Sequence, residues 1–440
     1  MSHQIIDLFT GWPSPKLLPA SRLLEASQRV LSDPDVAASA LQYGPDPGCA
    51  ALREAIAEWI NDFYSAPWTM PSRICISGGA SQSLACILQV YTDPTYTKNI
   101  FMIAPTYHLA CKVFEDNGFA GRLKAVPEDE QGIDIDYLEN FLLKGAVTGS
   151  CSSKTYLKTL EPSKKFYKYV IYTVPTFSNP SGKTMTAHRR RQLVRLARRH
   201  DALVIADDIY DQLQWPQERL RPHVLPRLVD IDHELDGGPA RATADGFGNA
   251  ISNGSFSKIL APGCRTGWVE ATEKFIDGLA KCGSTRSGGS ASQLTATVIA
   301  DLLHRGDLTE HINHCLIPAL ERRYRLMMDA IQRYLEPLGA GVKGMPPSLN
   351  QTSGAVCDGG GYFVWIELPY PITSREFAIR ARDQAHVLVA EGPLFEVNGD
   401  ERSMKCDREV RICFTWEDET LLTEGIQRLG NVISDMLGEN

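Results

Sequence analysis

The chain has 440 residues, of which 43% are hydrophobic, 22% are charged and 8% are aromatic. These proportions are typical of a globular protein with a large core, and they exclude a disordered chain. The formal net charge of −8 and the lack of a basic tail argue against nucleic acid as the main partner. The sequence contains neither the roughly 18 consecutive apolar residues of a membrane span nor the N-terminal pattern of a signal peptide. We therefore expect a cytoplasmic protein.

Short apolar strands alternate with amphipathic helices between residues 50 and 300. The expected strands are Arg73–Ile76, Ile100–Ala104, Tyr169–Val174, Leu203–Ala206 and Ala250–Ser255. The expected helices include Leu52–Phe63, Ser83–Tyr91, Leu109–Asn117 and Ala187–His200. This alternation predicts an α/β fold, with a mostly parallel central sheet that is covered by helices on both faces.

The pattern changes after Asp301, where we expect a smaller α+β domain. Its predicted elements are helix Leu316–Leu335, strand Tyr362–Glu367, helix Ser374–Ala385, strands Val387–Ala390 and Val410–Phe414, and helix Asp418–Leu437. The N-terminal segment, residues 1–43, is expected to contribute to this small domain and to the substrate site. The predicted large domain then spans residues 44–305, and the small domain spans residues 306–440.

Three polar insertions interrupt the pattern, at Lys144–Lys165, Pro216–Gly248 and Val397–Asp407. The second insertion is long and acidic, and Asp230 and Asp232 are among its residues. Polar connecting segments ordinarily run over the surface of a protein. We therefore expect all three insertions to be surface excursions.

The eleven cysteines include no Cys-x-x-Cys pair, and several, such as Cys75 and Cys413, lie inside apolar runs. This is typical of buried, reduced thiols in an intracellular protein. The clustered Cys and His spacing of a zinc site is absent, so we expect no metal.

Polar motifs follow several of the expected strands at their carboxyl ends, where open α/β sheets bind ligands. The segment from Ser77 to Ser81 contains Gly78-Gly79 and opens a helix, whose first N–H groups can hold an anion. Asn179-Pro180 follows the expected strand Tyr169–Val174. Either motif alone is also ordinary turn chemistry.

Two further strands end in charged residues. Asp207 and Asp208 close a wholly apolar strand, where isolated carboxylates are unfavourable and need cationic partners. Lys258 follows another strand, between Ser257 and Arg265. A neighbouring arginine and a low-dielectric site would lower the pKa of this lysine and favour the neutral amine that Schiff-base chemistry requires.

In order and spacing, these segments resemble the fold-type I pyridoxal-phosphate enzymes, the class I/II aminotransferases. Within them they resemble the eukaryotic branch that handles 2-aminoadipate, kynurenine and aromatic amino acids. The resemblance runs over nearly the whole chain, from Gly11-Trp12-Pro13 to Val410-Arg411-Ile412. It implies pyridoxal 5′-phosphate as the cofactor. It also implies transfer of an amino group between an amino acid and a 2-oxo acid through a Schiff base on Lys258.

The resemblance also assigns roles around the cofactor ring. Lys258 would form the Schiff base and move the proton, and Asp207 would sit at the pyridine nitrogen and keep it protonated. Asp208 is the weaker candidate for that position. Tyr210 and Asn179 would hydrogen-bond the phenolic oxygen of the ring. Tyr107 would stack on the ring face, although a packed core tyrosine is the alternative for that residue.

The remaining roles concern the phosphate and the substrate. The phosphate ligands implied by the resemblance are the backbone N–H groups of Ala80 and Ser81, the hydroxyls of Ser255 and Ser257, and the guanidinium of Arg265. The substrate would be bound by Arg411, which matches the arginine for the α-carboxylate, with Asn179 and Gly11 beside it. Tyr43 resembles the tyrosine that reaches the phosphate of the neighbouring subunit, which implies a homodimer with shared active sites. The alternative for Tyr43 is a strand-end tyrosine.

Two alternatives to an aminotransferase stay open at this point. Some fungal enzymes of similar sequence are carbon–sulfur lyases of sulfur secondary metabolism, including gliotoxin-type thiol release, and the residues named above serve both reactions equally. The second alternative is a cofactor-binding regulator. Such regulators usually carry an N-terminal DNA-binding module, and we do not expect one here because the aminotransferase-like pattern begins by residue 5.

Overall fold

The structure is a computed structural model that describes residues 4–147, 156–159, 161–216, 224–241, 244–286, 288–343 and 357–439. Its centre is an eight-stranded sheet with the order β2-β10-β9-β7-β6-β3-β4-β5. The strands are β2 (Ile74–Ser77), β3 (Asn99–Ala104), β4 (Leu123–Asp129), β5 (Gly132–Ile133), β6 (Tyr169–Thr173), β7 (Ala202–Asp207), β9 (Ala250–Ser255) and β10 (Gly267–Glu270). The pairs from β9 to β4 are parallel, whereas β10 and β5 run antiparallel to their neighbours. This confirms the predicted α/β architecture with a mostly parallel sheet.

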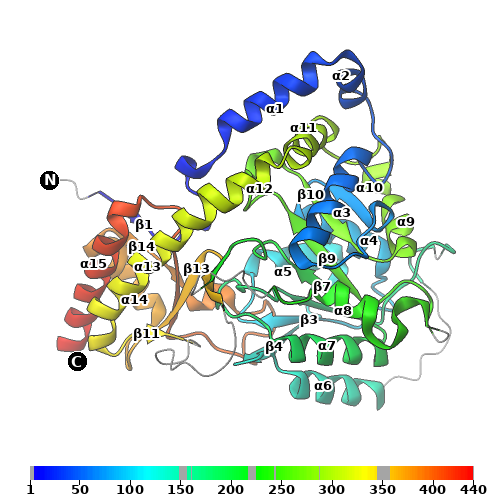
Figure 1. Ribbon diagram of the computed structural model, residues 1–440. Coiled ribbons are helices and arrows are strands. Elements are labelled where there is room, and N and C mark those ends of the chain that lie inside the picture. The colour runs from blue at the N-terminus through cyan, green and yellow to red at the C-terminus, as the bar shows by residue number, and fades with distance from the viewer. Residues whose placement is uncertain are drawn as a thin grey trace.

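Helices cover both faces of this sheet (Figure 1). One face carries α6 (Ile135–Val147), α7 (Ala187–Arg199) and α8 (Leu228–Glu234), and the other carries α3 (Ala50–Tyr64), α4 (Ala80–Tyr91) and α9 (Glu273–Ala280). Neighbouring residues of one strand enter different cores. In β3, for example, Ile100 and Met102 face one cluster of apolar side chains, while Phe101 and Ile103 face the other. Burial on both faces explains why these strands are apolar throughout.

A second, four-stranded sheet with the order β11-β13-β16-β15 lies beside the first. Its strands are β11 (Gly341–Val342), β13 (Phe363–Glu367), β15 (Ala390–Glu391) and β16 (Glu409–Cys413), and all of its pairs are antiparallel. The helices of this part are α13 (Ile317–Tyr334), α14 (Ser374–Ala385) and α15 (Glu419–Gly438). A short ribbon of β8 (Gln214–Pro216) and β12 (Cys357–Gly360) connects segments that precede and follow α13.

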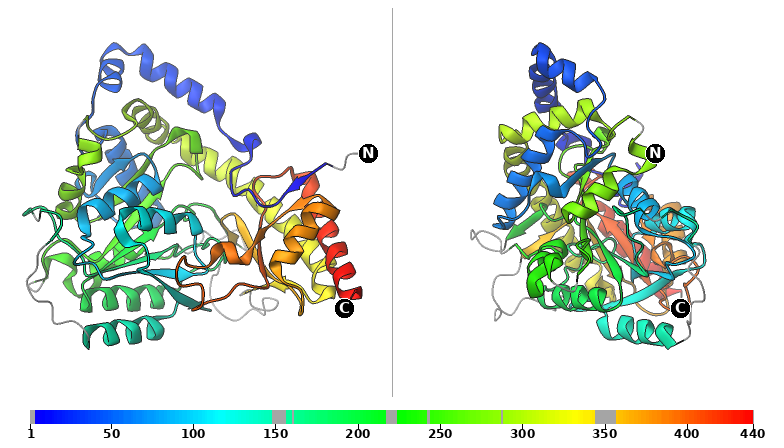
Figure 2. Two further views of the ribbon diagram at one scale, coloured as in Figure 1. Left: turned by 180° about the vertical axis from the view of Figure 1, so that it is seen from behind. Right: turned by 90° about the vertical axis from the view of Figure 1, so that its right-hand side faces the viewer.

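The N-terminal segment joins this smaller sheet region and then turns away from it. Strand β1 (Ile6–Asp7) pairs in parallel with β14 (Val387–Leu388), so both chain ends lie on the same side of the molecule (Figure 1). Helices α1 (Ala20–Ser32) and α2 (Pro34–Leu41) then form an arm along the outside (Figure 2). Arg29 anchors this arm, because its guanidinium lies 2.6 Å from Asp301 and 3.0 Å from Asp307.

Four shorter or outer helices complete the described fold. These are α5 (His108–Phe114), α10 (Gly283–Arg286), α11 (Gln293–His304) and α12 (Asp307–His311). Helix α11 packs on α3 and on the arm, and α12 leads from it into α13. Among the described residues, no helix is both long enough and apolar enough to cross a membrane.

The expectation that the insertion at 216–248 runs over the surface is wrong for residues 227–232, which are all buried. Helix α8 packs against α7 and β9, and the side chains of Arg227, Asp230 and Asp232 are almost fully buried. Asp232 accepts a hydrogen bond of 2.8 Å from Arg198 Nε and one of 2.6 Å from the backbone of Asn249. Asp230 and Asp232 can therefore lie inside the protein because each has a cationic or N–H partner there, whereas Glu234, Asp236 and Asp245 are exposed.

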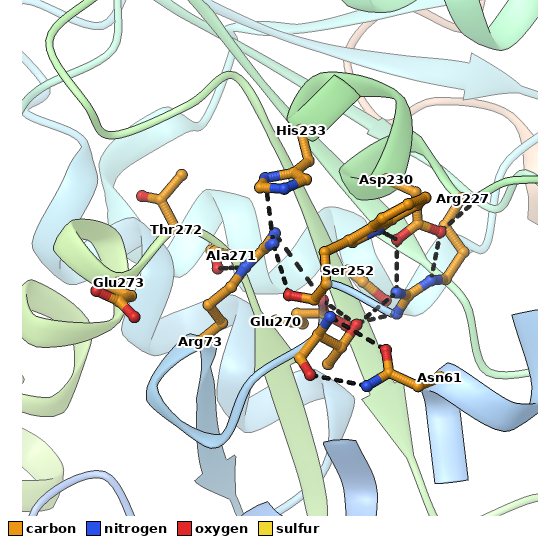
Figure 3. A network of polar contacts seen from close by, with 12 residues as sticks. Asn61, Arg73, Arg227, Asp230, His233, Ser252, Glu270, Ala271, Thr272 and Glu273 are labelled. Atoms are coloured by element: carbon orange, nitrogen blue, oxygen red, sulfur yellow. Dashed lines mark hydrogen bonds and ion pairs between the residues drawn. The ribbon is translucent and has the colours of Figure 1, made fainter. Parts of the chain in front are cut away.

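Arg227 is the centre of a buried group that we call the Arg227 cluster: Thr69, Arg73, Arg227, Asp230 and Glu270. Figure 3 labels the last four of these residues. Its guanidinium lies 2.7 Å from Asp230 and 2.6 Å from Glu270. Glu270 also accepts a hydrogen bond of 2.8 Å from the hydroxyl of Thr69, and Arg73 lies 4.0 Å from it. The cluster ties the start of α8 to β10 and to the segment before β2.

The other two insertions are only partly on the surface. Residues 148–155 and 160 of the first lie outside the described residues, but Lys158 donates hydrogen bonds of 2.7–3.1 Å to the carbonyls of Leu88, Gln89 and Thr92 at the end of α4. In the third, Val397 and Cys406 are buried. Nine cysteines with described side chains are free thiols, and seven of them are buried, whereas Cys264 is partly exposed and Cys315 is exposed.

Candidate active site

A cavity of about 520 Å³ opens where the carboxyl edge of the central sheet meets the N-terminal segment and the smaller sheet. Twelve of the predicted site residues line it: Gly11, Ala80, Ser81, Tyr107, Asn179, Asp207, Tyr210, Ser255, Ser257, Lys258, Arg265 and Arg411. Tyr107, Asn179, Asp207 and Lys258 come together because β3, β6, β7 and β9 are parallel neighbours, so the segments after these strands meet at one edge. Gly11 and Arg411 reach the same cavity from the N-terminal segment and from β16. The remaining predicted residue, Tyr43, lies outside the cavity of its own chain and is 85% exposed.

Lys258 lies just beyond β9, with its amine inside the cavity. Nζ donates a hydrogen bond of 2.7 Å to the carbonyl of Gly11 and lies 4.8 Å from the ring centre of Tyr362. The pKa of Lys258 is lowered to about 8, chiefly by burial and also by Arg411, while Cys413 and Asp207 act in the opposite direction. About a tenth of the amine is therefore neutral at pH 7 and about half at pH 8, and the neutral amine is the form that attacks a carbonyl.

Asp207 ends β7 and is a buried residue in the wall of the cavity. Its Oδ2 accepts a hydrogen bond of 2.7 Å from the hydroxyl of Tyr172, whereas Oδ1 has no partner among the described residues. Burial raises the pKa of Asp207 to about 6, and the hydrogen bond from Tyr172 and the charge of Lys258 limit the rise. A buried carboxylate oxygen without a donor is an open position for a cationic N–H group of a ligand.

Asp208 does not line the cavity. Its Oδ2 accepts a hydrogen bond of 2.5 Å from the hydroxyl of Ser252, and its backbone N–H donates to the carbonyl of Asn253. Burial and the nearby Asp211 raise its pKa well above the ordinary range. Successive residues at the end of a strand point to opposite sides, which separates the two adjacent carboxylates and places only Asp207 in the cavity.

The start of α4 and Arg265 together form a site suited to an anion. Gly79 has a φ of +106°, and a Cβ at this position would lie 2.9 Å from Arg265 Nη2, so a glycine is needed there. Arg265 donates hydrogen bonds of 3.0 Å to the carbonyls of Gly78 and Pro262. The hydroxyls of Ser255 and Ser257 are 3.0 Å apart on the same rim. Helix N–H groups, hydroxyls and a guanidinium are the groups that bind a phosphate without a metal.

Arg411 projects from β16 into the opposite end of the cavity. Nη1 donates a hydrogen bond of 3.0 Å to Asn179 Oδ1, and Nη2 donates one of 2.8 Å to the carbonyl of Phe9. Its Nε has no partner in the described part of the chain. The guanidinium lies 4.1 Å from the ring centre of Phe363 and 4.9 Å from that of Phe395. A buried arginine held between aromatic rings is a binding position for a carboxylate.

Two tyrosines line the cavity between these ends. Tyr107 follows β3 and is partly buried, and burial and Asp207 raise the pKa of its hydroxyl. Tyr210 is buried, with its ring centre 5.6 Å from that of Tyr362 and 6.2 Å from that of Phe363. Burial raises the pKa of Tyr210 well above its ordinary value. Both residues are therefore available as neutral hydrogen-bonding or stacking groups.

Sequence reasoning missed several residues that shape the site. Tyr172 was assigned only to a strand, although it lies near the carboxyl end of β6, beside the strand that bears Asp207. That position was a usable signal. Phe9 and Phe363 come from two other segments and share no local pattern with Arg411, so no signal in the sequence indicated their arrangement around it.

Comparison with known proteins relates this geometry to one family. The chain matches the family described as "Aminotransferase class I and II" over residues 14–429. An uncharacterized protein of Saccharomyces cerevisiae is 33% identical over 98% of this chain and 97% of its own length. Aromatic-amino-acid aminotransferase 1 of Thermococcus litoralis is 31% identical over 99% of this chain and 89% of its own length.

A solved structure shows the same arrangement of elements. It is the α-aminoadipate aminotransferase of Thermus thermophilus, complexed with N-(5′-phosphopyridoxyl)-L-leucine. It is 25% identical to this chain and superimposes with a TM-score of 0.76, with 99% of this chain and 94% of that chain covered.

Proposed function

Since this chain belongs to the class I and II aminotransferases, which are pyridoxal 5′-phosphate enzymes of fold type I acting on amino acids and 2-oxo acids, we propose the more specific activity that its cavity supports. It transfers the amino group of an aromatic or 2-aminoadipate-like amino acid to a 2-oxo acid. The observation that carries this proposal is the buried Arg411 between two phenylalanine rings, in one cavity with Lys258 and Asp207.

The described residues fit the cofactor at three separate positions. Asp207 Oδ1 lacks a partner among them, the glycine before α4 leaves room for an anion at its first N–H groups, and the amine of Lys258 has a lowered pKa. Asp207 would hold the pyridine nitrogen, and Tyr107, Tyr210 and Asn179 would contact the ring. The phosphate would be held by Ala80, Ser81, Ser255, Ser257 and Arg265. When bound, the cofactor supplies an aldehyde that carries the amino group and a ring that withdraws electrons from the substrate Cα.

Lys258 has the position and the pKa of a group that takes up and returns a proton. At pH 8 about half of its amines would be neutral, because its pKa is about 8. Its hydrogen bond to the carbonyl of Gly11 fixes the direction of the amine without neutralising a charge. We propose that Nζ removes the proton from the substrate Cα, and that Asp207, as a carboxylate, favours this step by holding positive charge at the far side of the ring.

Arg411 would bind the α-carboxylate of the substrate. Its hydrogen bonds to Asn179 and Phe9 hold the guanidinium in place before a substrate arrives, and its Nε remains available within the described site. Because the guanidinium is already in position and shielded from water, its hydrogen bonds to the substrate carboxylate would orient the substrate. The substrate Cα would then lie within reach of Lys258.

The lining of the cavity favours an aromatic side chain over an acidic one. Among the described lining residues, the Lys and Arg side chains are Lys258, Arg265 and Arg411, and each already has a proposed role. Apolar residues of the N-terminal segment and of α5 also line the cavity, among them Trp12, Leu109 and Val113. An apolar pocket with few polar groups selects by shape and by burial of apolar area.

Two proposals concern the setting of the chain. We propose a homodimer in which Tyr43 reaches the phosphate site of the partner subunit, since this residue is exposed and lies outside its own cavity. Exposed leucines of the arm, Leu24, Leu31 and Leu41, would be covered in such a dimer. We also propose a cytoplasmic location, which the free thiols support.

Products formed without a 2-oxo acid test the reaction type. The cofactor-loaded protein, which should absorb near ~420 nm, is mixed separately with L-phenylalanine, with L-2-aminoadipate and with S-benzyl-L-cysteine. We expect loss of this band and one equivalent of 2-oxo acid per site from L-phenylalanine, with a weaker response to L-2-aminoadipate. Release of thiol and ammonia from S-benzyl-L-cysteine, with the band retained, would contradict an aminotransferase and indicate a carbon–sulfur lyase.

A further inference from the structure

Glu128, near the end of β4, is a buried carboxylate that none of the roles above uses. Its side chain is 4% exposed, whereas that of Glu130, two residues further on, is 79% exposed. Oε2 of Glu128 accepts a hydrogen bond of 3.1 Å from the hydroxyl of Ser181, and Oε1 lies 3.9 Å from Nζ of Lys183. A buried carboxylate is unfavourable without partners, so its retention beside Ser181 requires an explanation.

The partners of Glu128 belong to the turn that carries Asn179. Within this turn the backbone N–H of Ser178 donates to the carbonyl of Lys183 at 2.9 Å, and that of Gly182 donates to the carbonyl of Ser178 at 2.6 Å. Ser181 therefore lies on a closed turn whose shape is set locally. The contact with Glu128 fixes this turn to the central sheet, because β4 is part of that sheet.

The same turn reaches the carboxylate site at its other end. Asn179 lies two residues before Ser181, and its Oδ1 accepts the hydrogen bond of 3.0 Å from Arg411 Nη1. A displacement of the turn would move Asn179 and release the guanidinium from one of its two described hydrogen-bond partners. Displacements of an ångström or less at such a site are enough to weaken binding.

We propose that Glu128 is a positioning residue, which through Ser181 holds the turn bearing Asn179 and thereby sets how tightly Arg411 binds the substrate carboxylate. This inference rests on the proposed function, since it takes Arg411 as the carboxylate site. Glu128 acts on binding and not on proton transfer, because it contacts neither Lys258 nor Asp207 in the described structure.

The charges around Glu128 make this contact sensitive to pH. Burial raises the pKa of Glu128 to about 7, while Lys183 and the hydrogen bond from Ser181 lower it, and Glu130 and Asp129 raise it. Arg189 faces the same group of acids and lies 2.7 Å from Asp129. An ionised carboxylate accepts a stronger hydrogen bond than a neutral one. Carboxylate binding should therefore tighten as the pH rises through about 7.

The test is a titration of the cofactor-loaded protein with 3-phenylpropionate, a carboxylate without an amino group, followed by the cofactor absorbance. Glu128→Leu should raise the Kd roughly fivefold to tenfold at pH 8, an effect of the size of one net hydrogen bond, because Asn179 would no longer be held against Arg411. The kcat for the amino acid should change by less than roughly twofold, since no catalytic group is removed. The control is Glu130→Gln, which removes a carboxylate equally near Lys183 but exposed, and should leave Kd unchanged.

Glu128→Gln keeps an acceptor for Ser181 but cannot ionise, so it isolates the effect of the charge. Its Kd should match that of the wild type at pH 6 and stay constant to pH 8, while the wild-type and Glu130→Gln proteins bind more tightly at pH 8. Equal pH profiles in Glu128→Gln and the wild type, or a loss of kcat without a change in Kd in Glu128→Leu, would overturn the inference. If Glu128→Leu does not fold, the pH profile of Glu128→Gln alone decides.

The proposed function fails in a different way in the same experiment. If Arg411→Ala binds 3-phenylpropionate as tightly as the wild type, Arg411 is not the carboxylate site, and the inference about Glu128 falls with it. If Arg411→Ala abolishes binding and the Glu128 variants match the control, the carboxylate site stands and only the role of Glu128 is overturned.

Discussion

Two groups of buried charges in this chain are satisfied in different ways. In the Arg227 cluster, the guanidinium of Arg227 lies between Asp230 and Glu270, and these acids take further hydrogen bonds from Trp68 and Thr69 (Figure 3). In the cavity, Asp207 Oδ1 and Arg411 Nε have no partner among the described residues. Burial of charge is unfavourable in both places. Buried charges that are paired stabilise the fold, whereas buried charged groups with an unpartnered atom are positions where a ligand can bind.

Arg227 and Arg411 show this difference in their pKa values. Burial lowers the pKa of Arg227, but Asp230 and Glu270 raise it by more, so it lies well above the ordinary value. Burial also lowers the pKa of Arg411, and the groups that act against it, Cys413 first, do not offset this. An arginine stays charged in either case. Arg411 therefore lacks the carboxylate that Arg227 has, and a bound substrate would supply one.

The largest effect is expected from removing the amine of Lys258 from the cavity. Lys258→Ala should reduce transamination by at least roughly a thousandfold, because both the Schiff-base amine and the proton-transfer group are lost. It should also abolish the absorbance near ~420 nm. Lys258→Arg is the control, since it keeps a cation in the cavity without a nucleophile and should be equally inactive. A variant that keeps the wild-type band would contradict the assignment of Lys258.

The next effect concerns the open carboxylate oxygen. Asp207→Asn should lower kcat by about 10²–10⁴-fold and leave the cofactor bound, because the amide cannot stabilise a protonated ring nitrogen. Asp208→Asn is the matched control, since Asp208 faces Ser252 outside the cavity. Measured turnover should change little in this control. If Asp208→Asn lowered kcat more than Asp207→Asn, Asp208 would be the residue that contacts the ring nitrogen.

The closed cluster should respond in stability instead of activity. Arg227→Met should lower the free energy of unfolding by about 3–5 kcal/mol, because Asp230 would lose its cation and Glu270 would keep only Arg73, at 4.0 Å. Arg322→Met is the control, because its pairing with Glu419 is exposed and should contribute less than about 1 kcal/mol. Urea denaturation measures both. Unchanged stability together with lost activity would show that the Arg227 cluster belongs to the site.

Removal of the open arginine should weaken substrate binding. Arg411→Ala should reduce the affinity for carboxylate substrates by about 2–5 kcal/mol, the range for loss of one member of a buried charge pair. Arg408→Ala, nearby and partly exposed beside Glu367, is the control. The measurement is kcat/KM for an amino acid and for its amide, which lacks the carboxylate. The kcat/KM of Arg411→Ala should fall for the amino acid and change little for the amide. An equal fall in kcat/KM for both substrates would contradict the role of Arg411 in binding the carboxylate.

The smallest effect is a pH dependence of stability in the cofactor-free protein. Lys258 has a pKa of about 8 when folded, against an ordinary value of 10.5, so the unfolded chain binds more protons between these values. Stability should therefore rise with pH, by roughly 2 kcal/mol between pH 8 and pH 10. Urea denaturation of Lys258→Met at both pH values should lack this rise. The same rise in the variant would show that other groups cause it.

Much of the fold could be predicted from local patterns. Strand Ala250–Ser255 and helix Ser374–Ala385 have the predicted bounds, because each is a regular run ended by turn residues. Helix α5 ends at Phe114, earlier than predicted, since the chain continues as a wider turn over Glu115–Phe119 in which Asn117 and Gly118 leave helical geometry. The predicted strand Val387–Ala390 is two short strands with different partners, β1 and β16, which only the tertiary fold determines.

The site was predictable where chemistry follows a strand end, and not where distant segments meet. Asp207 and Lys258 could be found because parallel strands place their carboxyl ends together. The contact of Lys258 with Gly11 and that of Arg411 with the carbonyl of Phe9 join segments hundreds of residues apart. The buried Arg227 cluster was missed because polar residues without apolar periodicity look like a surface loop. The roles of the site residues, like the domain boundaries, stay predictions.

The pairing of β1 with β14 has a consequence for the order in which the molecule is made. Residues 6–7 find their partner strand only at residues 387–388, and Gly11 and Phe9 reach an active site that also needs Arg411. During synthesis, residues 6–7 therefore stay unpaired until residues 387–388 have left the ribosome. Closing so long a loop slows folding more than it reduces stability. Assembly of a competent active site is thus a late event, and a prematurely terminated chain would contain the central sheet without it.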